Sequence, residues 1–209
     1  MLEFKPLGKE VNFLKEYFEQ STIAFCDISL GVRFMWREDF VIEYAIFNHT
    51  LIMKESSMDY ENAFYYPMGK DVEGALEEIE NYCIKNNLPL KFCCIDNKVV
   101  AKLSERYNSI TVSNDRNWSD YIYDAEKFKT FSGKKYSGQR NHVNKFRKTY
   151  PDYVVSKITP QDLPDIKEFI WRYEAENDFS LWSAREELRK MEEYLDNIFK
   201  KIRIFDFKN

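Results

Sequence analysis

The chain has 209 residues, of which 44% are hydrophobic and 17% aromatic, and its formal net charge is −4. This length and aromatic content are typical of a packed globular protein and exclude a largely disordered chain. No apolar run approaches the roughly 20 residues that a membrane helix needs, and the N-terminal MLEFKPLGKE has no apolar signal core. These features predict a cytoplasmic protein without a transmembrane segment.

The first part of the chain predicts a strand, two short helical pieces and a hairpin. Residues 2–7 form a candidate strand, and the helix after it has Val11, Leu14 and Phe18 on one face. A second short helix and a loop are expected within residues 23–40. Two β-branched runs then follow and meet at Asn48-His49, which predicts a β-hairpin formed by residues 41–48 and 50–56.

Strands and helices alternate after this hairpin. Helices are predicted from about Val72 to Cys83 and from about Asn97 to Tyr107. The predicted strands are residues 63–67, 89–95, 110–113 and 118–123. This order predicts an α/β protein with a mixed sheet.

The glycine-containing loop at residues 68–75 leads from a predicted strand into a helix, an arrangement that can bind phosphate at the helix N-terminus. Asp71 and Glu73 occupy the positions where a pyrophosphate would lie. Because like charges repel, these carboxylates oppose phosphate binding at this loop.

The four cysteines show no metal-binding spacing. Cys26, Cys83, Cys93 and Cys94 contain no C-x-x-C pair, and the adjacent Cys93 and Cys94 would point to opposite faces of a strand. They are expected to be buried thiols, without a metal or disulfide role.

Basic residues concentrate in one segment, Lys127 to Pro151. Eight Lys and Arg lie between Lys127 and Lys148, and no Asp or Glu interrupts them. In a chain of negative net charge, such a block indicates either an anionic partner or an acidic neighbour within the fold.

Within this segment the sequence predicts a helix from Gly138 to Thr149, capped by Ser137 and ended by Pro151. Lys134 and Lys135 precede the helix start, where unpaired N–H groups favour an anion. The predicted anion-binding or donor-binding residues are Lys134, Lys135, Arg140, Asn141, His142, Lys145, Arg147 and Lys148. The alternative is a solvated basic face packed against an acidic domain.

The last part of the chain predicts a strand at 153–158 and two helices. Thr159 with Asp162 is expected to cap the first helix, and Ser183 with Glu186 the second. The tail KKIRIFDFKN is expected to form one short strand at most.

The order of elements over residues 1–124 resembles the acyl-CoA N-acyltransferase (GNAT) fold. The strings SLGVRFMWREDF, YYPMG, WSDYIY and GKKYSGQRNHVNKFRKTYP are similar to an uncharacterised bacterial family related to the C-terminal domain of phosphatidylglycerol lysyltransferase, a tandem of GNAT-like units. The resemblance implies one complete GNAT-like unit at 1–124, a basic connecting helix at 125–152, and the start of a second unit at 153–209.

This resemblance implies an acyl- or aminoacyltransferase whose phosphate-bearing donor, an aminoacyl-tRNA or acyl-CoA, binds the basic helix. No other cofactor is indicated. The alternative is a truncated, non-catalytic anion- or nucleic-acid-binding module of the same fold, so enzyme activity stays open. An incomplete second unit would leave apolar helix faces uncovered, which predicts self-association through residues 159–199 and little transferase activity.

No catalytic residue can be assigned from the sequence. His49 is expected at a solvated turn, and His142, among basic neighbours, is expected to make a phosphate or structural contact. Asp120, Tyr121 and Tyr123 form a candidate pocket on the predicted strand at 118–123. Asp120 would lie on the face opposite the two tyrosines, and the structural alternative is that it pairs with the basic helix.

Overall fold

The computed structural model describes residues 2–23, 25–57, 60–177 and 182–198. Contacts between residues divide the chain into two compact units. The first unit joins the residues up to Ser113 with the described residues from Pro164 onward, and the second comprises Asn114–Leu163. These contact boundaries differ from the predicted division at residues 124 and 153, which concerns internal repeats and stays a prediction.

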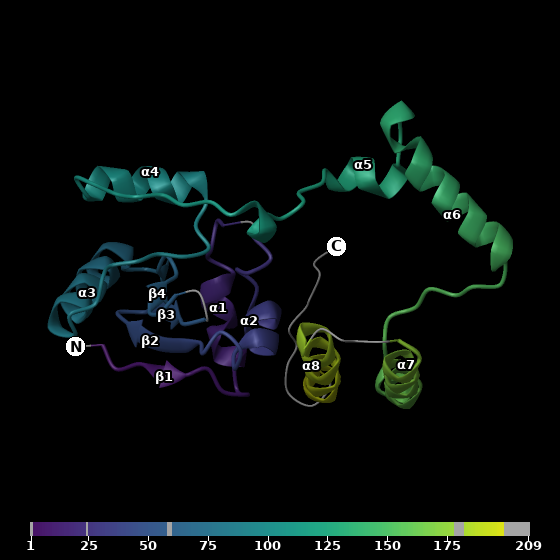
Figure 1. Cartoon of the computed structure of the whole chain (residues 1–209), viewed down its shortest axis with the longest axis horizontal. Coiled ribbons are helices and arrows are strands. Elements are labelled where there is room, and N and C mark those ends of the chain that lie inside the picture. Colours follow the sequence, from purple (N-terminus) through teal and green to yellow (C-terminus); the bar gives the residue numbers. More distant parts are fainter. Residues whose placement is uncertain (1, 24, 58–59, 178–181, 199–209) are drawn as a thin grey trace. The chain divides into compact units, whose positions relative to one another are not determined.

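The first unit is built on an antiparallel sheet (Figure 1). Its described strands are β1 (Lys5–Pro6), β2 (Glu43–Phe47), β3 (Thr50–Glu55), β4 (Ala63–Phe64) and β5 (Met68–Gly69). The order is β1-β2-β3-β4, and β5 also pairs with β3. With helices packed on this sheet, the predicted α/β class is confirmed. The predicted mixed sheet is wrong for the described strands, because all their pairings are antiparallel.

The β2–β3 hairpin is confirmed at its predicted turn. Glu43 pairs with Lys54 at one end and Phe47 with Thr50 at the other, so a two-residue loop joins the strands. Asn48 and His49 both have positive φ, 44° and 57°. Two successive positive φ values characterise the turn that fits the twist of a hairpin, and Asn tolerates this conformation better than most residues.

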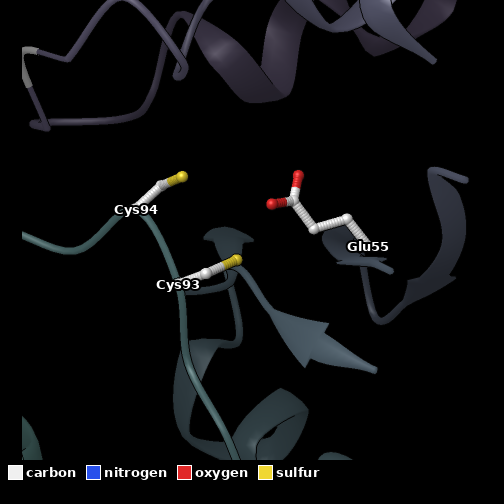
Figure 2. Close-up of side chains that lie close together, drawn as sticks. All are labelled: Glu55, Cys93 and Cys94. Atoms are coloured by element: carbon white, nitrogen blue, oxygen red, sulfur yellow. The ribbon is translucent and has the colours of Figure 1, made fainter. Parts of the chain in front are cut away.

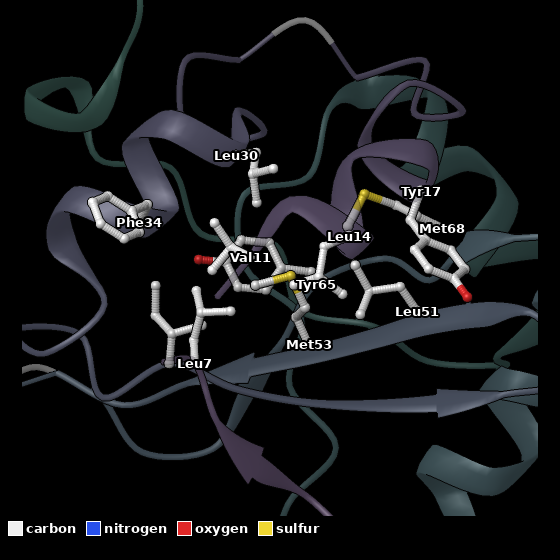
Figure 3. Close-up of a cluster of buried hydrophobic side chains, with 11 residues drawn as sticks. Leu7, Val11, Leu14, Tyr17, Leu30, Phe34, Leu51, Met53, Tyr65 and Met68 are labelled. Atoms are coloured by element: carbon white, nitrogen blue, oxygen red, sulfur yellow. The ribbon is translucent and has the colours of Figure 1, made fainter. Parts of the chain in front are cut away.

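One face of the sheet is covered by the helices of the N-terminal segment (Figure 3). Leu51 and Met53 point to this face of β3 and pack with Leu14 of η1 (Asn12–Leu14) and Phe34 of α2 (Leu30–Trp36). Tyr17 belongs to the same cluster and lies on α1 (Lys15–Phe18). Glu55 comes two residues after Met53 on the strand. Side chains two residues apart on a strand point to the same face, so the carboxylate of Glu55 also faces α2.

The opposite face of the sheet is covered by α3 (Val72–Lys85). Ile52 packs there with Ala75 and Ile79. Leu76 of α3 contacts Val99 of α4 (Asn97–Arg106) in a third cluster. The resulting arrangement is a sheet with helices on both faces.

Ion pairs attach α8 (Trp182–Ile198) to the same unit near α2. Lys190 has a fully buried side chain and lies 2.6 Å from Glu38. Arg37, 2% exposed, lies 2.7 Å from Glu193. The preceding helix, α7 (Leu163–Glu176), places Ile170 in a buried position.

The second unit is helical in its regular parts. It contains η2 (Arg116–Trp118), α5 (Ala125–Thr130), η3 (Lys134–Tyr136), α6 (Ser137–Thr149) and η4 (Pro160–Asp162). The predicted cap at Thr159 is confirmed, because its N–H donates to Asp162 at 2.7 Å. Ser183 lies within α8 (Trp182–Ile198), but its side chain and the tail at 200–209 lie outside what the structure describes, so the predicted cap stays a prediction.

Four predicted strands are wrong. Residues 89–95 contribute only an isolated parallel bridge, Phe64 with Phe92, and residues 110–113, 119–123 and 153–158 form no regular element. β-branched and aromatic residues favour strands only where a partner strand is available, and here most of these side chains are exposed. Among the described residues, no helix is both long enough and apolar enough to cross a membrane.

Candidate functional site

The basic segment predicted from the sequence forms an exposed helical surface. Helix α6 covers Ser137–Thr149, and η3 immediately precedes it (Figure 1). All the predicted anion-binding side chains are exposed except that of Arg140, which is half-buried. At 100° per residue, Lys145 and Lys148 lie with Asn141 on the side of the helix away from Val143 and Phe146.

The start of α6 differs from the prediction. Ser137 is the first residue of the helix, the N-cap position is Tyr136, and no side chain caps the first turn. The basic residues Lys134 and Lys135 belong to η3, a separate 3-10 turn that begins after Gly133. The predicted Ser137 cap is therefore wrong, because the helical conformation already includes this residue.

Arg140 has a structural role that the sequence did not indicate. Its Nη1 donates to the carbonyl oxygens of Phe131 and Gly133, the latter at 2.7 Å. Gly133 has φ 92°, a conformation that a residue with a side chain adopts with strain. Arg140 thus holds the loop that carries Lys134 and Lys135 against the helix.

Aromatic rings stabilise the same loop. Ring centroids are 5.0 Å apart for Tyr123 and Phe128, 5.0 Å for Phe128 and Phe131, and 6.0 Å for Phe131 and Tyr136. The row runs from the segment before α5 to the start of α6. Tyr123 belongs to this row of rings. Tyr121, on the same irregular segment, is 82% exposed, and Asp120 is exposed as well.

A second concentration of polar chemistry lies inside the first unit, around Glu55. Arg33 donates to Glu55 at 2.8 Å, and both side chains are 2% exposed. Tyr65 and Tyr60 donate their hydroxyl hydrogens to Oε2 and Oε1 of Glu55, respectively. Arg33 also pairs with Asp27, so its guanidinium bridges two carboxylates.

The surroundings shift the pKa values of the arginine and the two tyrosines in this cluster. Burial alone would lower the pKa of Arg33, but the neighbouring Tyr65, Glu55 and Asp27 raise it overall. Burial also raises the pKa of Tyr65 and of Tyr60, and the hydrogen bond to Glu55 raises that of Tyr60 further. The guanidinium therefore stays charged and both phenols stay protonated, which keeps them donors to Glu55.

Two cysteines face this carboxylate (Figure 2). The ligating atoms of Glu55, Cys93 and Cys94 all lie within 4.8 Å of one another. Cys94 has φ 51°, so the chain leaves the extended conformation there. The two thiols therefore do not point to opposite faces, as they would on a strand. The prediction of buried thiols is confirmed for Cys83 but wrong for Cys26, which is exposed, while Cys93 and Cys94 are half-buried. A hydrogen bond with Cys94, together with burial, raises the pKa of the Cys93 thiol.

An open pocket of about 550 Å³ lies elsewhere on the first unit and is lined by Tyr66, Val72, Glu73, Lys102, Glu105 and Arg106. Arg106 is paired with Glu73 at 2.7 Å and with Glu80 at 2.8 Å. Its charge is therefore compensated within the protein. Nearby, the carboxylate of Asp71 accepts from the N–H of Gly74 at 3.0 Å and caps α3.

The sequence did not single out Arg33, Glu55 or the Cys93-Cys94 pair as parts of one site. The only local signal in the sequence was the presence of two charged residues, Lys54 and Glu55, inside a strand-like run. Both are buried in β3. The approach of the thiols depends on the turn at Cys94 and cannot be read from spacing.

A solved structure has the same fold. A crystal structure of a conserved protein of unknown function from Bacteroides thetaiotaomicron VPI-5482 matches with a TM-score of 0.83 at 24% sequence identity, over 95% of this chain and 68% of that chain. At this identity the match shows a shared fold. No curated protein matches the chain.

A family model matches residues 21–189 of the 209-residue chain, and its description is phosphatidylglycerol lysyltransferase, C-terminal. The matched span includes the β2–β3 hairpin, the Arg33–Glu55 pair and the whole of α6. This confirms the resemblance found in the sequence and the GNAT-like, acyltransferase-like character of the fold. The chain belongs to the phosphatidylglycerol lysyltransferase C-terminal family.

Proposed function

We propose that this protein is an acyl- or aminoacyltransferase-like protein that holds a phosphate-bearing donor on the basic surface of residues 127–148. The donor class is aminoacyl-tRNA or acyl-CoA, by analogy with the lysyltransferase for which the family is named. The observation that carries the proposal is the run of eight Lys and Arg without an intervening acid, displayed on exposed helices.

Charge is distributed unevenly between the two units. Residues 114–163 contain ten Lys and Arg against six Asp and Glu, whereas the whole chain contains 31 against 35. A positive unit in an acidic protein concentrates anions at one surface and accelerates their encounter with it. Phosphate groups are the anions for which such a cluster is best suited.

The distribution of ion pairs within the second unit supports an external partner for its basic residues. Lys129 is 2.8 Å from Glu126. Within residues 114–163, all of them described, no carboxylate lies at ion-pair distance from Lys134, Lys135, Lys145, Arg147 or Lys148. These cations are available to a ligand without loss of a carboxylate partner in their own unit, although Nζ of Lys135 lies 5.5 Å from the centroid of the Tyr136 ring.

Salt-dependent binding tests the proposal. Binding of tRNA and of CoA is measured against salt concentration for the wild type and for a variant with Lys134, Lys135, Lys145, Arg147 and Lys148 changed to Gln. Each cation that contacts a nucleic-acid phosphate contributes roughly 0.7 to 0.9 to the slope of log K against log salt. We expect the variant to lose most of this slope and of the affinity.

The matched control is Lys157→Gln, an exposed lysine of the same unit outside the run. It should change binding and slope little. Equal binding by the wild type and the five-residue variant, with circular dichroism showing both folded, would exclude the basic surface as the donor site.

The alternative function is a non-catalytic binding module of the same fold. The exposure of both histidines, His49 and His142, favours this alternative, because catalytic acid–base groups commonly lie in enclosed clefts. Mass analysis of lipid or amine acceptors incubated with a charged donor separates the two functions. A modified acceptor supports the transferase, and donor binding without product supports the module.

Two further expectations belong to this proposal. A cytoplasmic location would place the protein with both candidate donors. Self-association through residues 159–199 would use the apolar residues of α7 and α8.

A further inference from the structure

We infer that Cys93, Cys94 and Glu55 form a binding site for a soft or borderline divalent metal ion, of which Zn²⁺ is the biological representative and Cd²⁺ a suitable probe. The three ligating atoms already lie within 4.8 Å of one another, and the side chains point into one shared space (Figure 2). This site is independent of the basic surface on residues 127–148.

The donor set determines the class of ion. Two sulfurs and one carboxylate oxygen suit Zn²⁺ and its softer analogues, whereas Mg²⁺ and Ca²⁺ prefer oxygen ligands alone. Zinc–sulfur bonds of about 2.3 Å and zinc–oxygen bonds of about 2.0–2.2 Å require only a small contraction of the present spacing. Three protein donors leave the fourth tetrahedral position to water or to a ligand.

Glu55 can take part without losing its buried ion pair. Oε2 accepts the bonds from Arg33 and Tyr65. Oε1 accepts from Tyr60 and, among bonds to described residues, from no other donor. Since a carboxylate oxygen has two acceptor positions, Oε1 retains one for a metal. Arg33 and Tyr65 would then hold the Glu55 carboxylate in orientation through their hydrogen bonds to Oε2, as hydrogen-bond partners of metal ligands commonly do.

The local charges also balance. Two thiolates and one carboxylate carry three negative charges, which a divalent ion and the Arg33 guanidinium neutralise together. Asp27, which pairs with Arg33 on its other side, is 29% exposed and adds a negative charge at the margin of the cluster. Metal binding would displace the thiol protons, as it does at other cysteine sites.

The backbone presents the two thiols together. Cys93 is held by its N–H, which donates to the carbonyl of Phe64 at 2.8 Å, next to the Phe64–Phe92 bridge. Cys94 then adopts φ 51°, which turns the chain and brings its sulfur to the side of its neighbour. Adjacent cysteines on a regular strand would not share a ligand.

Cadmium titration tests this site. The full chain, kept in a phosphine reductant, is titrated with Cd²⁺ while the thiolate-to-metal absorbance is recorded. We expect one Cd²⁺ per chain with a two-thiolate band, and loss of most of that band in Cys93→Ser and in Cys94→Ser. Cys26→Ser and Cys83→Ser are matched controls and should keep the band, since neither thiol belongs to the cluster.

Two variants test the carboxylate. Glu55→Gln should keep part of the band but weaken Cd²⁺ binding by more than about tenfold, because even residues behind a ligand affect affinity by about 10–100-fold. Tyr60→Phe removes the competing bond to Oε1 without touching Arg33, so its affinity should be equal to that of the wild type or higher. It remains informative where Glu55→Gln fails to fold.

The outcomes are decisive in either direction. Absence of the band in the reduced wild type at one equivalent of Cd²⁺, or an unchanged band in the Cys93→Ser/Cys94→Ser double variant, would overturn the inference. A loss of binding in Tyr60→Phe would contradict the role of Oε1. An increase in the melting temperature of the wild type with Cd²⁺, absent from the double variant, would support a site in the folded state.

Discussion

Arg33 of α2 donates to Glu55 at the end of β3 across 2.8 Å, and each side chain is only 2% exposed. Both charges have left water, so removal of one leaves the other buried without its partner, at a cost of about 3–5 kcal/mol. We expect Arg33→Met to lower the free energy of unfolding in urea by about this amount. Glu126→Gln, which breaks the exposed pair with Lys129, should change it by no more than about 1 kcal/mol.

A double variant separates the pair from its surroundings. In Arg33→Met/Glu55→Leu the fully buried carboxylate is removed together with the guanidinium, and the carboxylate that remains, Asp27, is 29% exposed to water. The loss should therefore be smaller than the sum of the two single losses. Additive losses would mean that the two charges do not stabilise each other.

The attachment of α8 predicts a loss of stability in acid. A hydrogen bond from Lys190 holds the pKa of Glu38 below its ordinary value. Because the folded pKa is the lower one, the stabilisation is complete above the unfolded value of about 4.3 and is lost as the pH falls through the folded value. Once Glu38 is protonated, the carboxylate that remains near Lys190 among the described residues is the more distant Asp39, at 3.9 Å.

We therefore expect the free energy of unfolding to fall as the pH decreases below the unfolded value of about 4.3, and to fall less steeply in Glu38→Gln. Urea unfolding at several pH values measures both slopes. Glu38 also lies near Arg37 and Arg189, which lower its pKa in the same direction. Identical slopes for wild type and variant would show that this carboxylate makes no contribution.

The sequence predicted the elements whose signals are local. The β2–β3 hairpin depends on two alternating runs and on Asn48 at a turn that needs positive φ. The helices α3 and α4 depend on apolar spacing and on N-caps such as Asp96, which accepts from the N–H of Val99 at 2.9 Å. Such interactions involve residues only a few positions apart.

The features that depend on distant contacts were not predictable. Residues 89–95 have a strand-like composition, yet only Phe92 forms a bridge, because pairing depends on what lies alongside. The same applies to Glu55 and the thiols of Cys93 and Cys94, which the fold brings together from separate segments. The positive charge of the basic segment was predictable from its composition, whereas the hydrogen bonds of Arg140 to the backbone of its own loop were not.

Arg140 provides a test that distinguishes structural from ligand-binding cations. Arg140→Met removes the bonds to the carbonyls of Phe131 and Gly133, so the loop should open more often. Trypsin should then cut after Lys134 and Lys135 several times faster than in the wild type. Arg147→Met should leave this rate unchanged. Equal cleavage rates in all three proteins would show that the loop does not depend on Arg140.

The surface available for the proposed self-association is narrower than the sequence suggests. Ile170 and Leu195 are only 3% and 8% exposed, so they are already buried within the chain. Phe169 is 57% exposed and stacks on Tyr173 at 5.9 Å, which leaves an aromatic surface on α7. A charge placed there would have to be desolvated in any interface.

We therefore expect Phe169→Glu to weaken self-association in sedimentation equilibrium by about tenfold or more, since burying an unpaired charge costs at least about 1.4 kcal/mol. Ile84→Glu is the control, because Ile84 is 79% exposed on α3, outside residues 159–199. It should leave the association constant unchanged. A monomeric wild type at all concentrations, or an equal association constant for Phe169→Glu, would remove α7 as an interface, because an aromatic surface that drives association cannot accept a carboxylate without loss.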